Sequence, residues 1–323
     1  MTDKLVSIVI SAYNEEKNVA ELHKQLDHAL KNVKDINFEF LYVGDGSSDK
    51  TYVACQKLQQ KDERVKIVQL KRNFGHEIAM TAGMDFAKGD AVIFMDADLQ
   101  HPPVYIPKMI KAWQNGKEIV LTKRVDNKDT SKLYKLCAKT FYFILNKLSD
   151  TRIMESAPDF RLIDRKYVDF LKGFNEQDRL FRGLLSYIMP NDNVEIIDFV
   201  APPRFSGESK YNFFKSLKLA VNSIVQFSVL PLRLVIYLGI ATAILALLLG
   251  IQVFVEYFFL HNPTPGYATL MITIIFLGAV QLISIGIIGE YVGKIHMEVK
   301  KRPLYVADYI VKKARKNGDK KNI

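Results

Sequence analysis

The chain has 323 residues, a formal net charge of +10 and a mean hydropathy of +0.01, enough for one large domain or two modest ones. Its two cysteines, Cys55 and Cys137, have no paired spacing, which excludes a disulfide scaffold and suits a reducing compartment. No nucleic-acid motif accompanies the positive charge, so no nucleic acid is expected as a partner. The apolar run at residues 5–10 is too short for a signal peptide, so the N-terminal part is expected to stay in the cytosol.

The first half of the chain mixes charged and apolar residues as a globular domain does. Over residues 1–100, short apolar runs alternate with helical patterns, which predicts an α/β fold with a mainly parallel sheet and helices on both faces. The predicted strands are residues 5–12, 38–43, 65–70 and 91–95. The predicted helices are residues 16–33, 51–61 and 76–88, with His76 as the first residue of the last. A direct contact of His76 with a sugar is the alternative.

Polar side chains follow each predicted strand at its carboxyl end. They are Tyr13, Asn14 and Glu15, then Asp45, then Arg72, then Asp96 and Asp98. In open α/β sheets, ligands bind outside the carboxyl ends of the strands. Four polar clusters at one edge therefore predict a ligand site there.

Asp96 and Asp98 close the fourth strand. Residues i and i+2 of an extended chain face the same way, so both carboxylates can meet one cation. Hard oxygen ligands suit Mg²⁺ or Mn²⁺ shared with phosphates, and such a cation would stabilise charge growing on a diphosphate leaving group. The alternative is a solvated loop.

Residues 44–49 (GDGSSD) follow the second strand and match half of a dinucleotide fingerprint. The third glycine is missing, because Asp49 stands there, and the motif follows the second strand rather than the first. A nicotinamide or flavin site is therefore not expected. Asp45 is instead a candidate to accept hydrogen bonds from a nucleobase or ribose, and Asp49 is as well suited to cap the next helix.

The second half of the chain becomes apolar. Residues 213–231 predict an amphipathic helix on a membrane surface, with a core helix as the alternative. Residues 234–260 and 267–289 are each long enough to span a bilayer, and Glu256 is the only formal charge from residue 234 to 289. The rival reading is a pair of buried core helices.

The basic residues flank these two apolar segments. Five Lys or Arg lie at residues 204–233, ten follow residue 289, and none lies in the link at 261–266. The positive-inside rule therefore places both flanks, and both termini, in the cytoplasm of an integral inner- or plasma-membrane protein. The predicted organisation is a globular domain at 1–212, an interface helix at 213–231, a transmembrane hairpin at 232–290 and a basic tail at 291–323 that faces membrane lipid.

Eight motifs carry a resemblance to a known family. They are residues 11–16 (SAYNEE), 45–49 (DGSSD), 71–76 (KRNFGH), 95–103 (MDADLQHPP), 159–162 (DFRL), 181–183 (FRG), 207–211 (GESKY) and 289–294 (GEYVGK). In this order, over nearly the whole chain, they resemble the polyprenyl-phosphate glycosyltransferases of glycosyltransferase family 2, the group with dolichyl-phosphate mannose synthase and the bacterial undecaprenyl-phosphate glucosyltransferases. Two positions depart from the family pattern: Gly44 stands where an aspartate is common, and Pro158 where a glycine is common.

The resemblance implies a Rossmann-like GT-A nucleotide-sugar domain and an inverting, metal-dependent transfer. It implies that Asp45 contacts the base, that Asp96 and Asp98 hold the metal and diphosphate with Gln100 beside them, and that Asp159 lies near the attacking phosphate. The implied donor is a UDP-sugar, UDP-glucose or UDP-N-acetylglucosamine, and the implied acceptor is undecaprenyl phosphate. A lipid-linked sugar for cell-envelope glycan modification would be the product, and a homo-oligomer is compatible with a two-span anchor.

Asp159 and Asp98 are the candidate catalytic residues. A phosphate monoester has a second pKa near 6, so an acceptor phosphate requires little base catalysis. Asp159 is therefore left as a base, an orienting group, a metal ligand or a partner of Arg161 or Arg152. Cations must offset the meeting of two phosphates. The candidates are Arg124, Lys132, Arg182, Arg204 and Lys210.

Three other functions remain open at this level. A processive polysaccharide synthase shares such a donor domain, but residues 177–179 lack the Gln-x-x-Arg-Trp pattern. A non-enzymatic membrane scaffold would not need phosphate-binding residues at every strand end. A sugar-phosphate transferase would release UMP rather than UDP.

Overall fold

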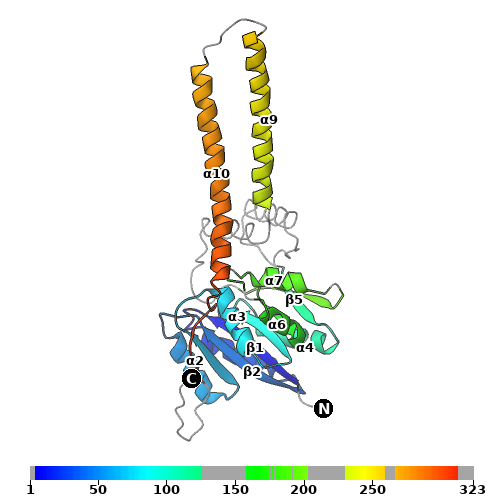
Figure 1. The fold of residues 1–323 in the computed structure, drawn as a ribbon. Coiled ribbons are helices and arrows are strands. Elements are labelled where there is room, and N and C mark those ends of the chain that lie inside the picture. The colour runs from blue at the N-terminus through cyan, green and yellow to red at the C-terminus, as the bar shows by residue number, and fades with distance from the viewer. Residues whose placement is uncertain are drawn as a thin grey trace. The chain divides into compact units, whose positions relative to one another are not determined.

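The computed structural model describes residues 4–125, 158–174, 176–177, 179–190, 192–202, 230–258 and 266–311. The chain divides into two units (Figure 1). The sheet unit joins Met1–Asn146, Thr151–Asn212 and Pro303–Ile323, and the hairpin unit joins Lys147–Asp150 and Phe213–Arg302. The sheet unit is therefore built from segments on both sides of the apolar part of the chain.

One sheet in the order β7-β5-β6-β4-β1-β2-β3-β8 forms the centre of the sheet unit. The strands are β1 (Lys4–Ala12), β2 (Ile36–Gly44), β3 (Val65–Leu70), β4 (Ala91–Asp96), β5 (Ile119–Arg124), β6 (Arg161–Asp164), β7 (Val194–Phe199) and β8 (Ala307–Val311). Strands β1 to β4 pair in parallel, as predicted, whereas β6 and β8 run antiparallel to their neighbours. The chain order reverses between β1 and β4, which is the position where open α/β sheets bind ligands.

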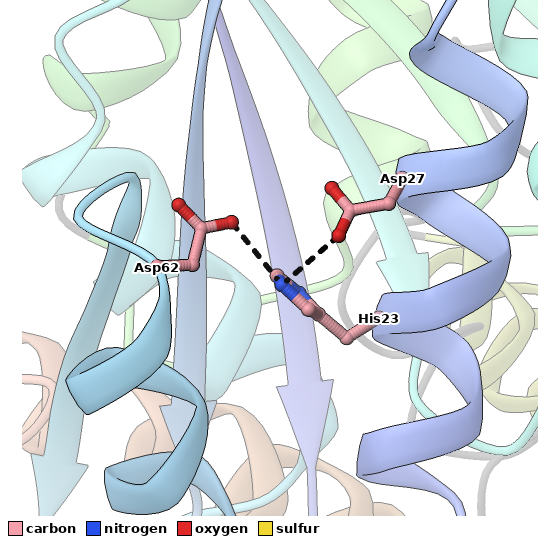
Figure 2. A group of neighbouring side chains, drawn as sticks. All are labelled: His23, Asp27 and Asp62. Carbon is pink, nitrogen blue, oxygen red and sulfur yellow. Dashed lines mark ion pairs between the residues drawn. The ribbon is translucent and has the colours of Figure 1, made fainter.

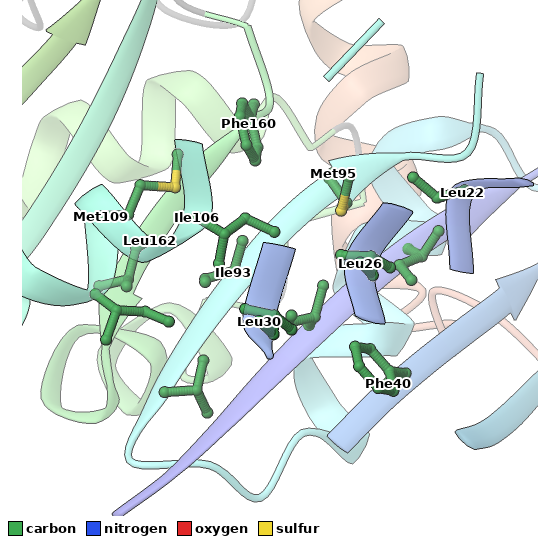
Figure 3. Close-up of a cluster of buried hydrophobic side chains, with 14 of the residues drawn as sticks. Leu22, Leu26, Leu30, Phe40, Ile93, Met95, Ile106, Met109, Phe160 and Leu162 are labelled. Carbon is green, nitrogen blue, oxygen red and sulfur yellow. The ribbon is translucent and has the colours of Figure 1, made fainter. Parts of the chain in front are cut away.

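Helices cover both faces of this sheet. They are α1 (Val19–Leu30), α2 (Thr51–Lys61), α3 (His76–Phe86), the 3-10 helix η1 (Pro103–Tyr105), α4 (Ile106–Gln114), α6 (Arg165–Lys172) and α7 (Phe181–Ile188). Successive strand residues point to opposite faces. In β1, Ile8 joins the cluster under α1 and α4, while Val9 joins the cluster under α3 and α7. Figure 3 shows the first cluster, where Leu22 and Leu26 of α1 meet Phe40 and Met95 of the sheet.

Helix α3 lies close against the sheet at Gly83. A Cβ atom there would stand 2.2 Å from Val9 Cγ1 and 3.0 Å from Val43 Cγ2. Only a glycine permits this approach. The close packing fixes the N-terminus of α3, which carries His76, relative to the carboxyl ends of β1 and β2.

A buried carboxylate, Glu39 of β2, joins strands β1, β2 and β3 through its side chain. The Glu39 side chain accepts hydrogen bonds from Ser7 Oγ at 2.5 Å and from Lys88 N at 2.7 Å, and it pairs with Lys66 Nζ. Burial alone would raise the pKa of Glu39, but the hydrogen bonds from Lys66, Ser7 and the Lys88 backbone outweigh it and lower that pKa.

Replacing Glu39 with glutamine is expected to lower the free energy of unfolding at pH 7 by about 2 kcal/mol, the usual worth of hydrogen bonds to a buried charge. Because the folded pKa of Glu39 is lowered, its stabilisation is present above its unfolded value, roughly 4.3, and is lost as pH falls through the folded pKa. Thermal unfolding in detergent should show the melting temperatures of the two proteins converging as pH falls below the folded pKa of Glu39. A Glu21→Gln control, on an outward-facing residue, should match the native protein at both ends; a gap that persists in acid contradicts the prediction.

The hairpin unit contains two long apolar helices, α9 (Leu230–Phe258) and α10 (Tyr267–Val299), which lie side by side in Figure 1. Within Leu232–Gln252 and Ile272–Val299, 18-residue windows have mean hydropathies of 2.6 and 2.3, and both stretches are long enough to cross a bilayer. Their side chains are exposed, including Leu247 at 65% and Leu282 at 72%. A surface of this kind is suited to lipid rather than water.

The segment after the second apolar stretch differs from the predicted basic tail. Helix α10 continues ten residues past Gly289, because the polar residues there are helix formers and only the apolar composition ends. Residues 307–311 then form β8, which pairs with β3 of the sheet unit. In addition, Lys71 N donates to Val306 O at 3.0 Å and Tyr305 Oη donates to Asp85 at 2.9 Å. The signal for this strand lies in its β-branched and aromatic residues, Tyr309, Ile310 and Val311, which a count of charges does not register.

Several predicted features lie outside the described residues. They are the basic residues Lys132, Arg204 and Lys210, the interface helix up to residue 229, most of the link at 261–266 and the last part of the basic tail. These features stay predictions.

Candidate active site

The carboxyl ends of β1 and β4 are joined by side chains. Ser11 pairs in register with Asp96, and Ser11 Oγ donates to Asp96 Oδ1 at 2.8 Å. Asp96 is thus held at the point where the strand order reverses. Side-chain contacts therefore join β1 and β4 at the edge of the sheet where a ligand site is predicted.

Asn14 and Glu15 connect the first two loops at this edge. Asn14 has a positive φ of 59°, and its Oδ1 accepts from Ser48 N at 2.9 Å. Glu15 N donates to Thr51 Oγ1 at 2.8 Å. Tyr13 is 39% exposed beside them. In the structure Asn14 and Glu15 shape the loops, and Tyr13 offers a ring on the outside of the same edge.

Asp45 organises the third loop. Its side chain is buried and accepts hydrogen bonds from Phe74 N at 2.7 Å and Gly75 N at 2.9 Å. Next to it, a Cβ on Gly46 would lie 2.3 Å from the backbone carbon of Arg72. Asp45 therefore holds the backbone of the loop that carries Arg72, in addition to any contact with a base. The exposed Arg72 guanidinium lies 4.7 Å above the Phe74 ring.

Asp49 lies just before helix α2, whose N-cap residue is Lys50. Asp49 Oδ1 accepts from Thr51 N at 2.9 Å, and Glu16 N donates to Oδ2 at 3.2 Å. Burial would raise the pKa of Asp49, but these hydrogen bonds together lower it. Asp49 therefore binds the first backbone N–H of α2 from the position before the N-cap.

The loop after Asp96 turns sharply. Leu99 has a φ of 64°, which costs energy for a non-glycine residue, and Asp98 Oδ1 accepts from Gln100 N at 3.0 Å. The buried His101 stacks on Phe160, with ring centroids 5.2 Å apart, and its Nδ1 accepts from Asp96 N at 3.0 Å. Burial lowers the pKa of His101, which agrees with a neutral ring accepting at that nitrogen.

Asp96 and Asp98 fit a divalent cation by their chemistry. Burial acts to raise the pKa of Asp96, whereas the neighbouring His76 and the Ser11 hydrogen bond act to lower it, and the lowering prevails. An ionised carboxylate at the end of β4, two residues from a second one, is the oxygen donor set that Mg²⁺ and Mn²⁺ prefer.

Asp159 lies at the centre of a second charged group. It is 5% exposed and pairs with the buried Arg161. Arg182 binds it through two hydrogen bonds, Nε to Oδ1 at 3.2 Å and Nη2 to Oδ2 at 3.1 Å. Burial and the charge of Arg182 lower the pKa of Arg161. The pairing of Asp159 with Arg161, weighed from the sequence, is present, and it is joined by the predicted Arg182.

The helix N-termini around Asp159 are also fixed. Glu77, at the start of α3, accepts from Phe181 N at 2.9 Å, at the start of α7. This contact places Arg182 next to α3. Arg124 ends β5, and β5 runs parallel to β4 because β6 lies antiparallel between them, so Arg124 lies at the same edge. Its buried Nε has no hydrogen-bond partner among the described residues.

A different cluster meets the geometric conditions for a metal among the described residues. His23, Asp27 and Asp62 place their ligand atoms within 4.8 Å of one another (Figure 2). The guanidinium of Arg64 already lies there, 2.5 Å from Asp27 and 2.7 Å from Asp62. Asp62 and Arg64 also precede β3 and therefore lie away from the carboxyl ends of the strands. The cluster is an ion-pair group that ties α1 to α2.

The sequence alone did not single out the two residues that connect these groups. His76 is expected from the sequence as a helix start, which it is, with direct sugar contact as the alternative, and Arg161 only as a partner of Asp159. The relevant contacts join positions 11, 76, 96 and 159, which no spacing in the sequence relates.

Two family models match the chain. Glycosyl transferase family 2 matches residues 7–171, and the GtrB C-terminal hairpin matches residues 230–295. The first match covers the strands and loops of the candidate site up to α6. The second covers the two apolar helices.

Curated relatives match along almost the whole chain. An uncharacterized glycosyltransferase of Synechocystis is 40% identical over 93% of this chain and 94% of its own. A bactoprenol glucosyl transferase derived from the SfII prophage of Shigella flexneri is 38% identical over 93% and 96%. A prophage bactoprenol glucosyl transferase homolog of Escherichia coli K12 is 36% identical over 95% and 99%.

Solved structures are similar to the chain more distantly. Glucosyl-3-phosphoglycerate synthase of Mycobacterium tuberculosis, solved with Mn²⁺, UDP-glucose and phosphoglyceric acid, is 17% identical over 69% of this chain and 78% of that one, with a TM-score of 0.45. Residues 1–349 of TarS from S. aureus, solved with UDP, are 18% identical over 69% and 66%, with a TM-score of 0.44.

Proposed function

The chain belongs to glycosyl transferase family 2, and on this premise we propose that it transfers glucose from UDP-glucose to undecaprenyl phosphate at the cytoplasmic face of a membrane. It is a glycosyltransferase with a GT-A-like sheet and a GtrB-type hairpin. The names of its bactoprenol glucosyl transferase relatives support the glucose and the polyprenyl carrier. The basic flanks of the hairpin support the cytoplasmic side.

The observation that carries this proposal is the pair of charged groups at one sheet edge. Asp96 and Asp98 suit the donor side, because a divalent cation bound there would stabilise the negative charge of the departing UDP. Asp159 and Arg182 suit the acceptor side. A guanidinium has five N–H donors, and the contacts with Asp159 use two of them while 34% of the Arg182 side chain stays exposed. Arg182 is therefore held in place to meet a phosphate.

The reaction requires no proton transfer from the acceptor. A phosphate oxygen forms the new bond to the anomeric carbon while the bond from that carbon to UDP breaks, and UDP leaves with the electron pair. Because the acceptor phosphate is mostly deprotonated at neutral pH, we propose that Asp159 orients Arg182 and does not act as a base. Attack from the face opposite UDP gives the inverted anomer.

Mass spectrometry of the lipid products tests this function. Purified full-length protein in detergent, with undecaprenyl phosphate, Mg²⁺ or Mn²⁺ and a panel of nucleotide sugars, should yield lipid-linked hexose and free UDP from UDP-glucose. If lipid-linked N-acetylhexosamine formed instead, the donor sugar in the proposal would be N-acetylglucosamine and not glucose. Release of UMP would indicate phosphotransfer. Absence of a lipid product with every donor would overturn the proposed function. In sealed inside-out membrane vesicles, UDP-glucose added outside should be used without detergent; use only after lysis would contradict the cytoplasmic placement.

A further inference from the structure

The imidazole of His76 lies between the donor-side and acceptor-side groups. Its Nδ1 lies 3.1 Å from Ser11 Oγ and 3.4 Å from Asp96 Oδ1. Its Nε2 lies 3.2 Å from Asp159 Oδ2. One ring thus contacts the carboxylate assigned to the metal and the carboxylate that holds Arg182.

Hydrogen bonds to Asp45 fix the backbone just before His76. Asp45 accepts from both Phe74 N and Gly75 N, and Gly75 adopts a φ of 99°. Within the part of the chain that the structure describes, no atom lies within 4 Å of where a Cβ of Gly75 would be. The glycine is therefore required there by its backbone angle and not by crowding. The loop therefore turns α3 so that its first side chain points at the strand ends.

The rest of α3 is fixed as well. Glu77 accepts from Phe181 N, and Gly83 lies against the sheet. A helix of this kind needs no histidine at its first position, where a side chain can extend into water. The His76 side chain is 38% exposed, yet both of its nitrogens contact groups of the site.

We propose that His76 is a positioning residue that sets the spacing between the donor carboxylate Asp96 and the acceptor carboxylate Asp159. It acts through these two residues and does not itself touch the reacting atoms. The inference rests on the proposed function, because it assigns the two carboxylates to the two substrates. Its consequence is alignment: a shift of about 1 Å between reacting groups can cost roughly 100-fold in rate.

Three substitutions separate the two sides of the ring. The amide of asparagine reaches the position of Nδ1, and that of glutamine reaches the position of Nε2, whereas leucine fills the space without either contact. His76→Asn should keep the contact with Ser11 and Asp96 and lose Asp159. His76→Gln should keep Asp159 and lose the donor side. His28→Gln, on the exposed face of α1, is the matched control.

Two measurements on the full chain in detergent then distinguish the sides. Calorimetric binding of UDP with Mn²⁺ reports the donor side, and the KM for undecaprenyl phosphate reports the acceptor side. We expect His76→Asn to raise the acceptor KM about 10-fold and to leave UDP binding unchanged. His76→Gln should weaken UDP binding about 10-fold and leave the acceptor KM unchanged. His76→Leu should lose about 100-fold in kcat/KM. The melting temperature should stay constant.

Other outcomes overturn the proposal. Native kcat/KM in His76→Leu would show that the ring is dispensable, and equal losses in the Asn and Gln variants would remove the two-sided link. A common loss with a lowered melting temperature would make His76 a purely structural residue. If the native protein made no lipid-linked sugar, the proposed function would fail, and the calorimetric split between His76→Asn and His76→Gln would still decide the donor half of the inference.

Discussion

Replacing Asp96 with asparagine is expected to lower kcat for transfer to the lipid about 1,000-fold, the scale seen when charge stabilisation of a leaving group is removed. Asparagine is isosteric and can keep the contact from Ser11 Oγ, which is 2.8 Å long in the native protein. The substitution therefore removes the negative charge and leaves the strand end in place. The melting temperature should stay close to the native value.

Asp27→Asn provides the matched control for this prediction. Asp27 belongs to the only cluster of three or more potential metal ligands found among the described residues, and its side chain is 46% exposed. With Arg64 as its partner, we expect native activity and native dependence on Mn²⁺. Titrating Mn²⁺ while following UDP release separates the two sites. If Asp27→Asn lost most of its activity while Asp96→Asn stayed active, the cation would bind at the His23, Asp27 and Asp62 cluster and the prediction would be wrong.

Replacing Asp159 with asparagine is expected to have the second large effect, on both stability and transfer. The native carboxylate is buried with Arg161 and is also bound by Arg182. Without its charge, the buried guanidinium is uncompensated, which costs about 3 kcal/mol of unfolding free energy. Because Arg182 also loses its fixed orientation, we expect the acceptor KM to rise and kcat/KM for the acceptor to fall roughly 100-fold.

A double-mutant cycle with Arg182→Gln decides how Asp159 acts. If Asp159 works through Arg182, the double variant should be hardly worse in kcat/KM than the poorer single variant, since coupled residues are not additive. Steady-state kinetics at temperatures well below the melting transition keep the stability loss out of the comparison. If the fold losses in kcat/KM of the two single variants multiplied in the double variant, and Asp159→Asn lowered kcat with an unchanged acceptor KM, Asp159 would instead act as a general base.

The parts of the fold predicted well are those encoded locally. The apolar runs of β1 to β4 and the helices between them have strong period and composition signals, and their carboxyl ends carried the polar residues that form the site. Asp96 and Asp98 can be proposed from the sequence because they close a buried strand directly. Asp45 and Asn14 can be proposed in the same way, but their contacts with the backbone of other loops cannot, because those contacts join separate loops.

What the sequence did not reveal depends on long-range pairing. Strand β6 has four residues, too few for a periodicity, and it joins the sheet antiparallel. The link between Ser11, Asp96, His76 and Asp159 requires β1, β4, α3 and the β6 segment to be assembled first. Likewise, His23 and Asp27 share a helix face at i and i+4, but only the fold brings Asp62 and Arg64 to them.

The position of β8 in the chain has a consequence for how the protein is made. Strand β3 ends at Leu70, whereas its outer neighbour begins at Ala307, after both helices of the hairpin. A ribosome adds about 5–20 residues per second, N-terminus first, so β3 remains an open sheet edge until the hairpin has been synthesised. Completion of the sheet, and of the Lys71–Val306 contact beside the Arg72 loop, therefore follows synthesis of the hairpin in time. The nascent enzyme acquires β8 only after both hairpin helices have been made.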